Sequence, residues 1–184
     1  MSKSKTTWEM IKLGLILACY AVASCTVLAL VNWGTSAKIQ QNKIEKASQG
    51  MKAIIPEATE FIKVEDFAKS EDATISITEF YLAKLENETL GAIVQVSGPT
   101  YDKATIMLGL KPDGTILGLK FMELTDSPGF GQKANDPTFF VKSGKTFYGQ
   151  FEGLNAKEGF ILNKNVDVIS GATITSQGII NLIS

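Results

Sequence analysis

The feature that most constrains this chain is a long apolar run near its N-terminus, from Leu13 to Val31, which contains no charged residue. As an α-helix rising about 1.5 Å per residue, the run would extend about 28 Å, close to the thickness of the hydrocarbon core of a bilayer. Lys12 precedes it, and Asn32-Trp33-Gly34 follows it with the polar and aromatic residues typical of a membrane interface. We therefore predict one transmembrane helix over residues 13–31.

Two possible cleavage signals overlap this run. Val22-Ala23-Ser24-Cys25 resembles a lipoprotein cleavage box, and Ala21-Val22-Ala23 resembles a signal-peptidase site. A processed lipoprotein would continue with a polar tether, whereas here the apolar residues continue after Cys25, so we expect an uncleaved helix. Cys19 and Cys25 are spaced so that they do not share a helix face, and we interpret them as helix filling.

The orientation of the predicted span is not decided by its flanking charges. Three lysines lie on each side of it: Lys3, Lys5 and Lys12 before it, and Lys38, Lys43 and Lys46 after it. The rule that cytoplasmic flanks are richer in lysine and arginine therefore gives no direction here.

The residue types that are missing exclude several kinds of chemistry. Among 184 residues there is no histidine, and all 18 basic residues are lysines. Without histidine there is no Ser-His-Asp or Cys-His nucleophile and no His-ligated haem or zinc, and we predict neither a catalytic residue nor a metal site. Without arginine, an anion must be held by backbone N–H groups, hydroxyls or lysines. A net charge of −1 gives no sign of a nucleic-acid partner.

Cysteine usage narrows the choice of redox cofactor. Both cysteines of the chain lie inside the apolar run, so the remainder can form neither a disulfide scaffold nor a Cys-ligated iron–sulfur cluster. If that part of the chain performs redox chemistry, its cofactor must be organic.

The rest of the chain predicts one α+β domain behind a linker. Residues 32–56 are expected to form a stalk helix that stops at Pro56, because proline disfavours the α conformation in the residue before it. Five strand-like segments follow: Phe61–Val64, Ile75–Leu85, Leu90–Val96, Thr105–Leu110 and Ile116–Phe121. Short turns such as Pro112-Asp113-Gly114 join them, which favours a mainly antiparallel sheet with flanking helices over residues 57–184.

The C-terminal third is predicted to cover one face of this sheet. Residues 136–153 are rich in aromatic residues and glycines and are expected to be short helical or irregular structure. A last short strand is predicted at Val166–Ile169, followed by a terminal helix that is either short or cut by the end of the sequence. The apolar side of that helix is predicted to carry Ile174, Ile179, Ile180 and Ile183.

Two stretches in this third could carry chemistry. Residues 167–176 contain a carboxylate, four hydroxyls and one glycine between a predicted strand and a predicted helix, an arrangement that binds phosphate but is also typical of ordinary turns and caps. In the loop at 127–131, Gly129 and Gly131 bracket Phe130 and leave the backbone open to a flat ligand. The alternative for this loop is a Gly-rich turn with a buried phenylalanine.

Three stretches together resemble one protein family. Asp167-Val-Ile-Ser-Gly-Ala-Thr173 resembles the flavinylation motif D-x-x-[S/T]-G-A-T of FMN-binding domains. Ser127-Pro-Gly-Phe-Gly131 resembles their E-T-P-G-L-G loop, and Thr146-Phe-Tyr-Gly-Gln-Phe-Glu-Gly153 resembles their F-x-x-Q-F-x-G element. With one N-terminal membrane helix, the set is similar to the G subunits of Rnf electron-transport complexes and to the C subunits of sodium-pumping NADH:quinone reductases. The length of the chain favours the Rnf subunits.

The resemblance implies FMN joined through its phosphate to the hydroxyl of Thr173. The cofactor-binding residues that it implies are Thr173, Asp167, Ser170, Gly171 and Ala172 from the first motif and Ser127, Pro128, Gly129, Phe130 and Gly131 from the second. The backbone N–H groups of residues 170–172 would face the phosphate, and Phe130 would lie against the ring. The resemblance also implies a separate flavin transferase that uses FAD and a divalent metal, which agrees with the lack of a histidine that could activate the hydroxyl.

The family function that follows is that of an electron carrier rather than a stand-alone catalyst. Such a subunit passes electrons one at a time between the flavin or iron–sulfur centres of other membrane subunits, in a complex that links ferredoxin and NAD to ion translocation. The resemblance places residues 57–184 outside the cell membrane and residues 1–12 in the cytoplasm. Two alternatives stay open: a C subunit of the quinone reductase, and a membrane-anchored binding module that carries no flavin.

The chain also departs from the family pattern. Asp126 and Ser127 replace glutamate and threonine, Phe130 replaces leucine, and Leu124 aligns with a frequent histidine. We expect the turn to persist, whereas the role of Asp126 is left open.

Overall fold

The computed structural model of the protein describes residues 3–70, 72–86 and 88–184. The chain divides into two compact units, residues 1–45 and residues 46–184. Residues 1 and 2 of the predicted N-terminal tail lie outside the described residues.

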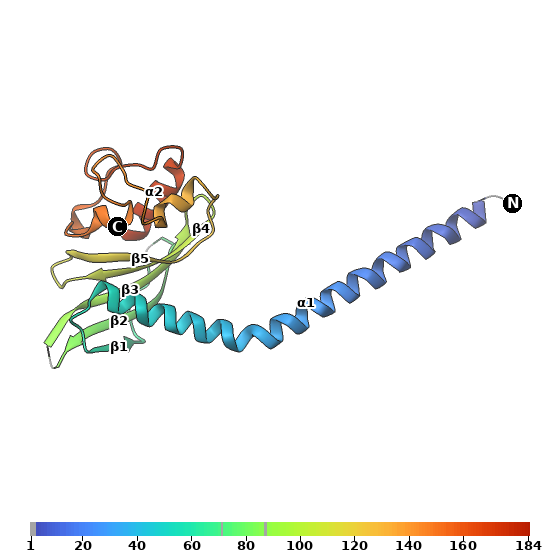
Figure 1. Ribbon diagram of the computed structural model, residues 1–184, viewed down its shortest axis with the longest axis horizontal. Helices are drawn as coiled ribbons and strands as arrows, with labels where there is room; N and C mark the ends of the chain where they lie inside the picture. The colour runs from blue at the N-terminus through green and yellow to red at the C-terminus, as the bar shows by residue number, and fades with distance from the viewer. Residues whose placement is uncertain (1–2, 71, 87) are drawn as a thin grey trace. The chain divides into compact units, whose positions relative to one another are not determined.

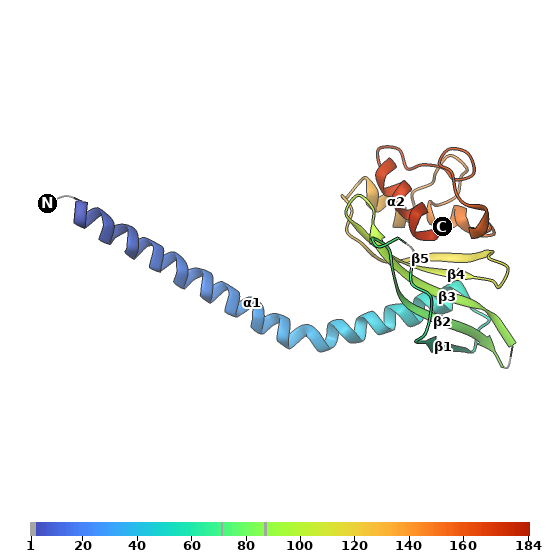
Figure 2. The same ribbon diagram turned by 180° about the vertical axis from the view of Figure 1, so that it is seen from behind.

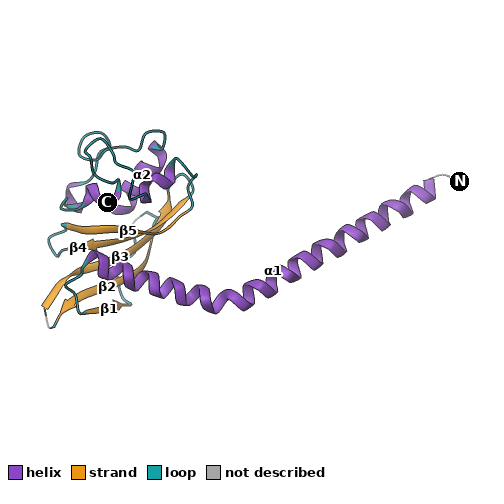
Figure 3. Ribbon diagram, viewed as in Figure 1, coloured by secondary structure: helices purple, strands orange, loops and turns teal. Residues whose placement is uncertain are grey.

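The first unit is formed by the long helix α1, which extends from Lys3 to Ile54 and so continues into the second unit (Figure 3). Within the described residues, α1 is the one helix long and apolar enough to cross a membrane. The hydroxyls of Thr26 and Thr35 donate to the carbonyls of Val22 and Val31, each at 2.8 Å, so neither hydroxyl is left without a partner in an apolar surrounding. The segment predicted as the stalk is helical up to Ile54 as part of α1, which ends just ahead of Pro56.

The second unit is built on a five-stranded antiparallel sheet whose strands lie in chain order (Figures 1 and 2). Its strands are β1 (Glu60–Val64), β2 (Ser76–Leu85), β3 (Glu88–Pro99), β4 (Lys103–Leu110) and β5 (Ile116–Leu124). Each of the five strand segments predicted between residues 61 and 121 is present, which confirms the antiparallel sheet and the α+β class. The agreement follows from short connections that leave little choice but an antiparallel partner.

Because side chains alternate along each strand, the sheet has an apolar layer on each of its two faces. On one face, side chains such as Ile106 and Leu108 pack against the terminal helix α2 (Thr173–Ile183) and the irregular segment before it (Figure 1). That segment contains three short 3₁₀ helices: η1 (Gly131–Asn135), η2 (Tyr148–Phe151) and η3 (Ala156–Glu158). On the other face, Ile93 and Met107 pack with the end of α1, at Met51 and Ile54.

Ile54 fits against the sheet because Gly109 has no side chain. Gly109 of β4 pairs with Gly118 of β5, and a Cβ atom on Gly109 would lie 2.2 Å from Cγ2 of Ile54. A Cβ atom on Gly118 would lie 3.6 Å from the same Cγ2 atom, which is an ordinary contact. The end of α1 is thus held by a depression in the sheet surface.

We expect Gly109→Ala to lower the free energy of unfolding by about 1–3 kcal/mol, because the added methyl group overpacks a fixed contact. Gly118→Ala, at the paired position, is the matched control and should be neutral or slightly stabilising, because alanine also costs less chain entropy than glycine. Thermal unfolding of the detergent-solubilised chain, followed by circular dichroism, measures both. Equal losses in the free energy of unfolding for the two variants would contradict the conclusion that Gly109 forms the depression for Ile54.

The predicted strand at Val166–Ile169 is wrong. This stretch makes one isolated parallel bridge, between Leu162 and Val166. Side chains bind the backbone groups that a strand would use: the amide of Gln150 bonds to both N–H and C=O of Asp167, and Ser176 Oγ accepts from the N–H of Ile169. The irregular course of residues 136–153 is confirmed, with Phe147 and Phe151 fully buried.

Candidate functional site

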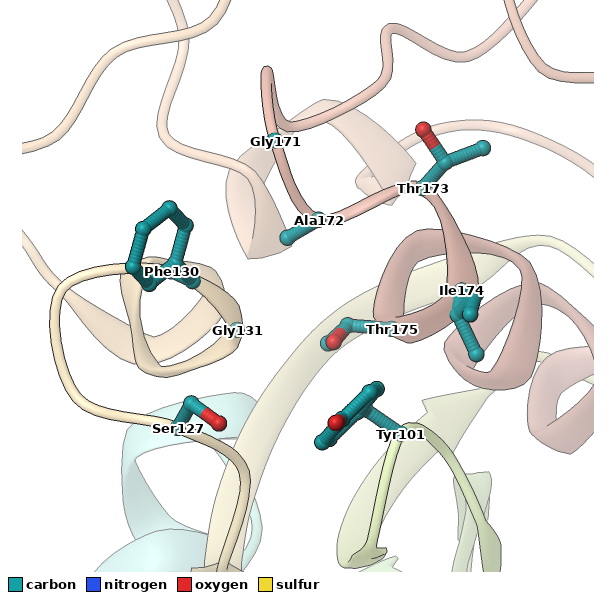
Figure 4. Close-up of a pocket in the computed structure, with 9 residues that line it drawn as sticks. All are labelled: Tyr101, Ser127, Phe130, Gly131, Gly171, Ala172, Thr173, Ile174 and Thr175. Carbon is teal, nitrogen blue, oxygen red and sulfur yellow. The ribbon is translucent and has the colours of Figure 1, made fainter.

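Three separated segments enclose a cavity of about 470 Å³ at the start of α2 (Figure 4). Its lining residues come from the β3–β4 turn, the loop after β5 and the turn into α2: Tyr101, Ser127, Phe130, Gly131, Gly171, Ala172, Thr173, Ile174 and Thr175. None of them carries a formal charge, and the volume lies in the range of small-molecule sites, about 300–1,000 Å³.

Aromatic side chains on two different loops face this cavity. Phe130 and Tyr101 lie on different sides of it (Figure 4), and both are more than half exposed, at 57% and 65%. Phe130 leans on Gly171, where a Cβ atom would lie 3.3 Å from Cδ1 of the ring. Gly171 also has φ of 80°, a left-handed conformation that glycine adopts at little cost. The turn into α2 therefore depends on glycine both for its path and for its contact with Phe130.

Thr173 is the first residue of α2 and lies exposed at the rim of the cavity. Its hydroxyl points away from the Tyr101 ring in Figure 4. No side chain caps the N-terminus of α2, so no capping side chain competes with a ligand for its first N–H groups. A hydroxyl beside free helix N–H groups is suited to carry a phosphate.

A buried carboxylate, Asp126, supports the cavity from behind. It accepts hydrogen bonds from the hydroxyls of Thr100 at 2.6 Å and Thr175 at 2.5 Å. It also accepts hydrogen bonds from the backbone N–H groups of Asp102 at 3.0 Å and Tyr101 at 3.3 Å. Asp126 thereby joins the loop after β5 to the β3–β4 turn and to the first turn of α2.

These bonds set the protonation state of Asp126. Burial by itself raises the pKa of the carboxyl group, but the two hydroxyls and two backbone N–H groups lower it by more, so its pKa lies below the ordinary value. Because the pKa of Asp126 is lower in the folded than in the unfolded chain, the ionised carboxylate stabilises the fold at pH values above its unfolded-state pKa of about 3.9. That stabilisation is lost as the pH falls through the lower pKa of the folded state.

We therefore expect the stability difference between the wild type and Asp126→Asn to shrink as the pH falls from about 6 toward 2. The variant lacks the titrating group, so this part of the acid destabilisation is absent from it. Urea unfolding at a series of pH values measures the difference. A difference that stays constant over this range would show that Asp126 is not the ionised group we describe.

A second set of bonds holds the segment that leads into α2. Gln150 of η2 is buried and binds the backbone of Asp167 from both sides, accepting from its N–H at 2.7 Å and donating to its carbonyl at 3.2 Å. The Asp167 carboxylate accepts from the N–H of Ser143 at 2.7 Å. Ser176 is also buried and bridges Ile169 N–H and Ala172 C=O.

The structure brings most of the predicted site residues together. Six of the ten line the cavity: Ser127, Phe130, Gly131, Gly171, Ala172 and Thr173. The other four do not line it: Asp167, Ser170, Pro128 and Gly129. The side chain and backbone of Asp167 instead form hydrogen bonds that hold the segment leading into α2. The N–H of Ala172 was expected to face the phosphate, but it already donates to the Ile169 carbonyl at 2.9 Å.

Sequence reasoning missed three lining residues. Tyr101 is a lone aromatic in the β3–β4 turn and belongs to none of the recognised motifs. Ile174, predicted on the apolar side of α2, is 63% exposed and lines the cavity, whereas Thr175 and Ser176 in the same turn are buried. Thr175 is one of the four hydroxyl residues of the 167–176 stretch, and its buried hydroxyl donates to Asp126.

Two family matches cover the two ends of this chain. Residues 100–184, which include the whole cavity, match the family described as FMN-binding domain. Residues 1–54, which include the whole of α1, match the family described as RnfG N-terminal region. Taken together, the two matches make this chain similar to the G subunits of Rnf complexes at both of its ends.

Two relatives named as G subunits align over nearly the full length of this chain. The G subunit of the Na⁺-translocating ferredoxin:NAD⁺ oxidoreductase complex of Acetobacterium woodii is 28% identical, with 96% of this chain and 90% of that protein covered. The G subunit of the ion-translocating oxidoreductase complex of Methanosarcina acetivorans is 27% identical, covering 100% and 94%. The C subunit of the Na⁺-translocating NADH-quinone reductase of Neisseria meningitidis is 33% identical, but over 64% of this chain and 49% of that protein.

Proposed function

We propose that this chain is a membrane-anchored electron-carrier subunit of an ion-translocating, Rnf-type oxidoreductase, and that it holds FMN in the cavity at the start of α2. The observation that carries the proposal is the position of Thr173. Its exposed hydroxyl lies at the uncapped N-terminus of α2, on the rim of an uncharged cavity within the part of the chain that matches FMN-binding domains.

The residues of the cavity fit FMN in two respects. Exposed aromatic side chains at Phe130 and Tyr101 offer faces for a flat ring. No lysine lines the cavity and the chain has no arginine, so a phosphate there would rely on the N–H groups of the first turn of α2 and on the helix dipole.

We further propose that the attachment is covalent, through Thr173 Oγ. The hydroxyl oxygen of Thr173 bonds to the FMN phosphorus of FAD as the phosphoanhydride bond breaks; AMP leaves, and the hydroxyl proton passes to the enzyme or solvent. Within the described residues no basic side chain contacts this hydroxyl, and the chain has no histidine, which supports the need for a separate flavin transferase.

When bound, FMN would supply the redox chemistry, and the chain would position it. Phe130 and Tyr101 would pack on the ring, and the cavity would exclude water from part of its surface. The partners that we propose are other membrane subunits of the same complex, with iron–sulfur or flavin centres close enough to exchange electrons. A covalent bond keeps the cofactor in place where free FMN is scarce.

We propose that the second unit faces the outside of the cell membrane, as the resemblance to the family implies. An alkaline phosphatase fused to the C-terminus would be active in intact cells on this topology. An inactive phosphatase, together with activity of a cytoplasmic reporter at the same position, would reverse the assignment.

Co-expression with a flavin transferase tests the cofactor and its linkage. The chain is then run on a denaturing gel and weighed by intact mass spectrometry. A fluorescent band with the mass of an FMN adduct is expected, because the phosphoester survives denaturation. A dark band without an adduct would favour a binding module that carries no flavin.

The similarity to the C subunit of the NADH-quinone reductase supports a second candidate, a flavin carrier in that complex. The match to the RnfG N-terminal region favours the Rnf type. Subunits that co-purify with the chain from its native membrane distinguish the two candidates.

A further inference from the structure

One buried charge beside the cavity has no part in holding FMN as proposed above. Asp126 is 0% exposed, and its hydrogen-bond partners are all neutral: two hydroxyls and two backbone N–H groups. In the part of the chain that the structure describes, the salt bridge is between Lys63 and Glu79, away from this residue. A carboxylate buried without a counter-ion is costly, so its presence calls for an explanation.

Asp126 lies directly behind the cavity wall. Two lining residues, Tyr101 and Thr175, donate hydrogen bonds to its carboxylate. A third, Gly131, touches it so closely that a Cβ atom there would lie 2.7 Å from Oδ2. A fourth, Ser127, is its neighbour in the chain. The negative charge is therefore separated from the ligand space by a single layer of residues.

No positive charge on the wall offsets this carboxylate. The nine lining residues are uncharged. The two lysines nearest to Asp126 in the chain, Lys120 and Lys133, have their Nζ atoms over the rings of Tyr148 at 5.7 Å and Phe139 at 5.2 Å. Charges interact more strongly in a partly dry protein site than in water, because the effective dielectric constant is lower. A ligand that gains negative charge in this cavity would be repelled by the carboxylate of Asp126.

We propose that Asp126 lowers the reduction potential of the flavin in this cavity by holding a fixed negative charge behind its wall. The inference rests on the proposed function, since it requires a flavin at this site. Each electron added to a flavin makes its ring more negative before any proton follows, so a nearby fixed anion disfavours the reduced form. The hydroxyls and N–H groups around Asp126 keep that anion ionised at neutral pH.

Spectroelectrochemical titration of the full chain carrying covalent FMN tests this inference at pH 7. Asp126→Asn removes the charge and nearly keeps the shape of the side chain. We expect its midpoint potential to be more positive, with a ratio of reduced to oxidised flavin about tenfold higher at a given ambient potential. For a two-electron couple, a tenfold change is about 30 mV.

Thr100→Val is the matched control. It deletes one hydrogen bond to Asp126 from a buried residue that does not line the cavity, and it keeps the carboxylate. Its stability should fall while its midpoint potential stays at the wild-type value. A wild-type potential in Asp126→Asn, or an equal positive shift in both variants, would overturn the inference.

Two further outcomes are separable from these. A wild-type chain that carries no flavin would refute the proposed function, whereas a flavinylated chain with unmoved potentials would refute only the role of Asp126. If Asp126→Asn does not fold, the midpoint potential of Ser127→Lys, at the exposed neighbouring position, tests the inference instead. Its added positive charge on the same wall should also raise the potential, and an unchanged value would overturn the inference.

Discussion

Thr173→Ala is expected to yield a folded chain that carries no covalently bound flavin after co-expression with a flavin transferase. Thr173 is exposed, and its side chain makes no described hydrogen bond, so its removal should change the free energy of unfolding by less than about 0.5 kcal/mol. The loss of flavin should be complete, because a phosphoester needs this oxygen. In-gel fluorescence and intact mass, each normalised to protein, measure the result.

Two variants show whether this oxygen is the only acceptor. Thr173→Ser keeps a hydroxyl at the same place and should keep the label, though a less restricted side chain could slow its formation. Thr175→Val should also keep the label, because the Thr175 hydroxyl is buried and donates to Asp126 at 2.5 Å. A label that persists in Thr173→Ala and disappears in Thr175→Val would move the attachment to Thr175.

The contrast between these two threonines could not have come from the sequence. Both stand among four hydroxyls in ten residues, and the family motif alone singles out Thr173. What separates them physically is the distant Asp126, which lies 49 residues from Thr175 in the chain and is joined to it by a hydrogen bond. Local patterns carry no information on such a pairing.

The sheet was predictable for the opposite reason. Each strand of the sheet pairs with its neighbour in the chain, so alternation and short turns were sufficient to predict its order and antiparallel sense. Val166–Ile169 shows the limit of that reasoning. Its β-branched residues favour a strand, but Gln150 and Ser176 bind its backbone groups, and the pattern of one segment cannot reveal partners elsewhere.

The cavity was predicted in part because two of its three walls are motif loops. The third wall, at Tyr101, is a turn whose backbone N–H donates to Asp126. Since Asp126 departs from the family residue and its partners are scattered, no stretch of sequence marks Tyr101 as part of the site. One buried carboxylate thus assembles the wall that sequence reasoning left out.

The second large effect is expected at Gly131, which has no room for a side chain. A Cβ atom there would lie 2.6 Å from Cβ of Asp126 and 2.6 Å from Oγ1 of Thr175. Gly131→Ala must therefore push apart the pair that joins the loop after β5 to α2. We expect a loss of about 3 kcal/mol in the free energy of unfolding, because overpacking adds to the cost of a buried carboxylate that loses a partner.

Gly129→Ala is the control, since it lies two residues away in the same loop. Its φ of 76° disfavours alanine, but nothing lies within 4 Å of the position of its Cβ atom. The expected cost is about 1 kcal/mol of backbone strain, with flavin attachment retained. Urea unfolding of both variants and in-gel fluorescence of their folded fractions measure the difference.

The pattern of the two losses separates strain from crowding. If backbone strain dominated in this loop, Gly129→Ala would be the worse variant, because only it has a positive φ. If contact between Gly131 and the Asp126–Thr175 pair dominates, Gly131→Ala loses both stability and flavin, since the first turn of α2 moves away from the cavity. Equal stability of the two variants would mean that this contact relaxes at little cost.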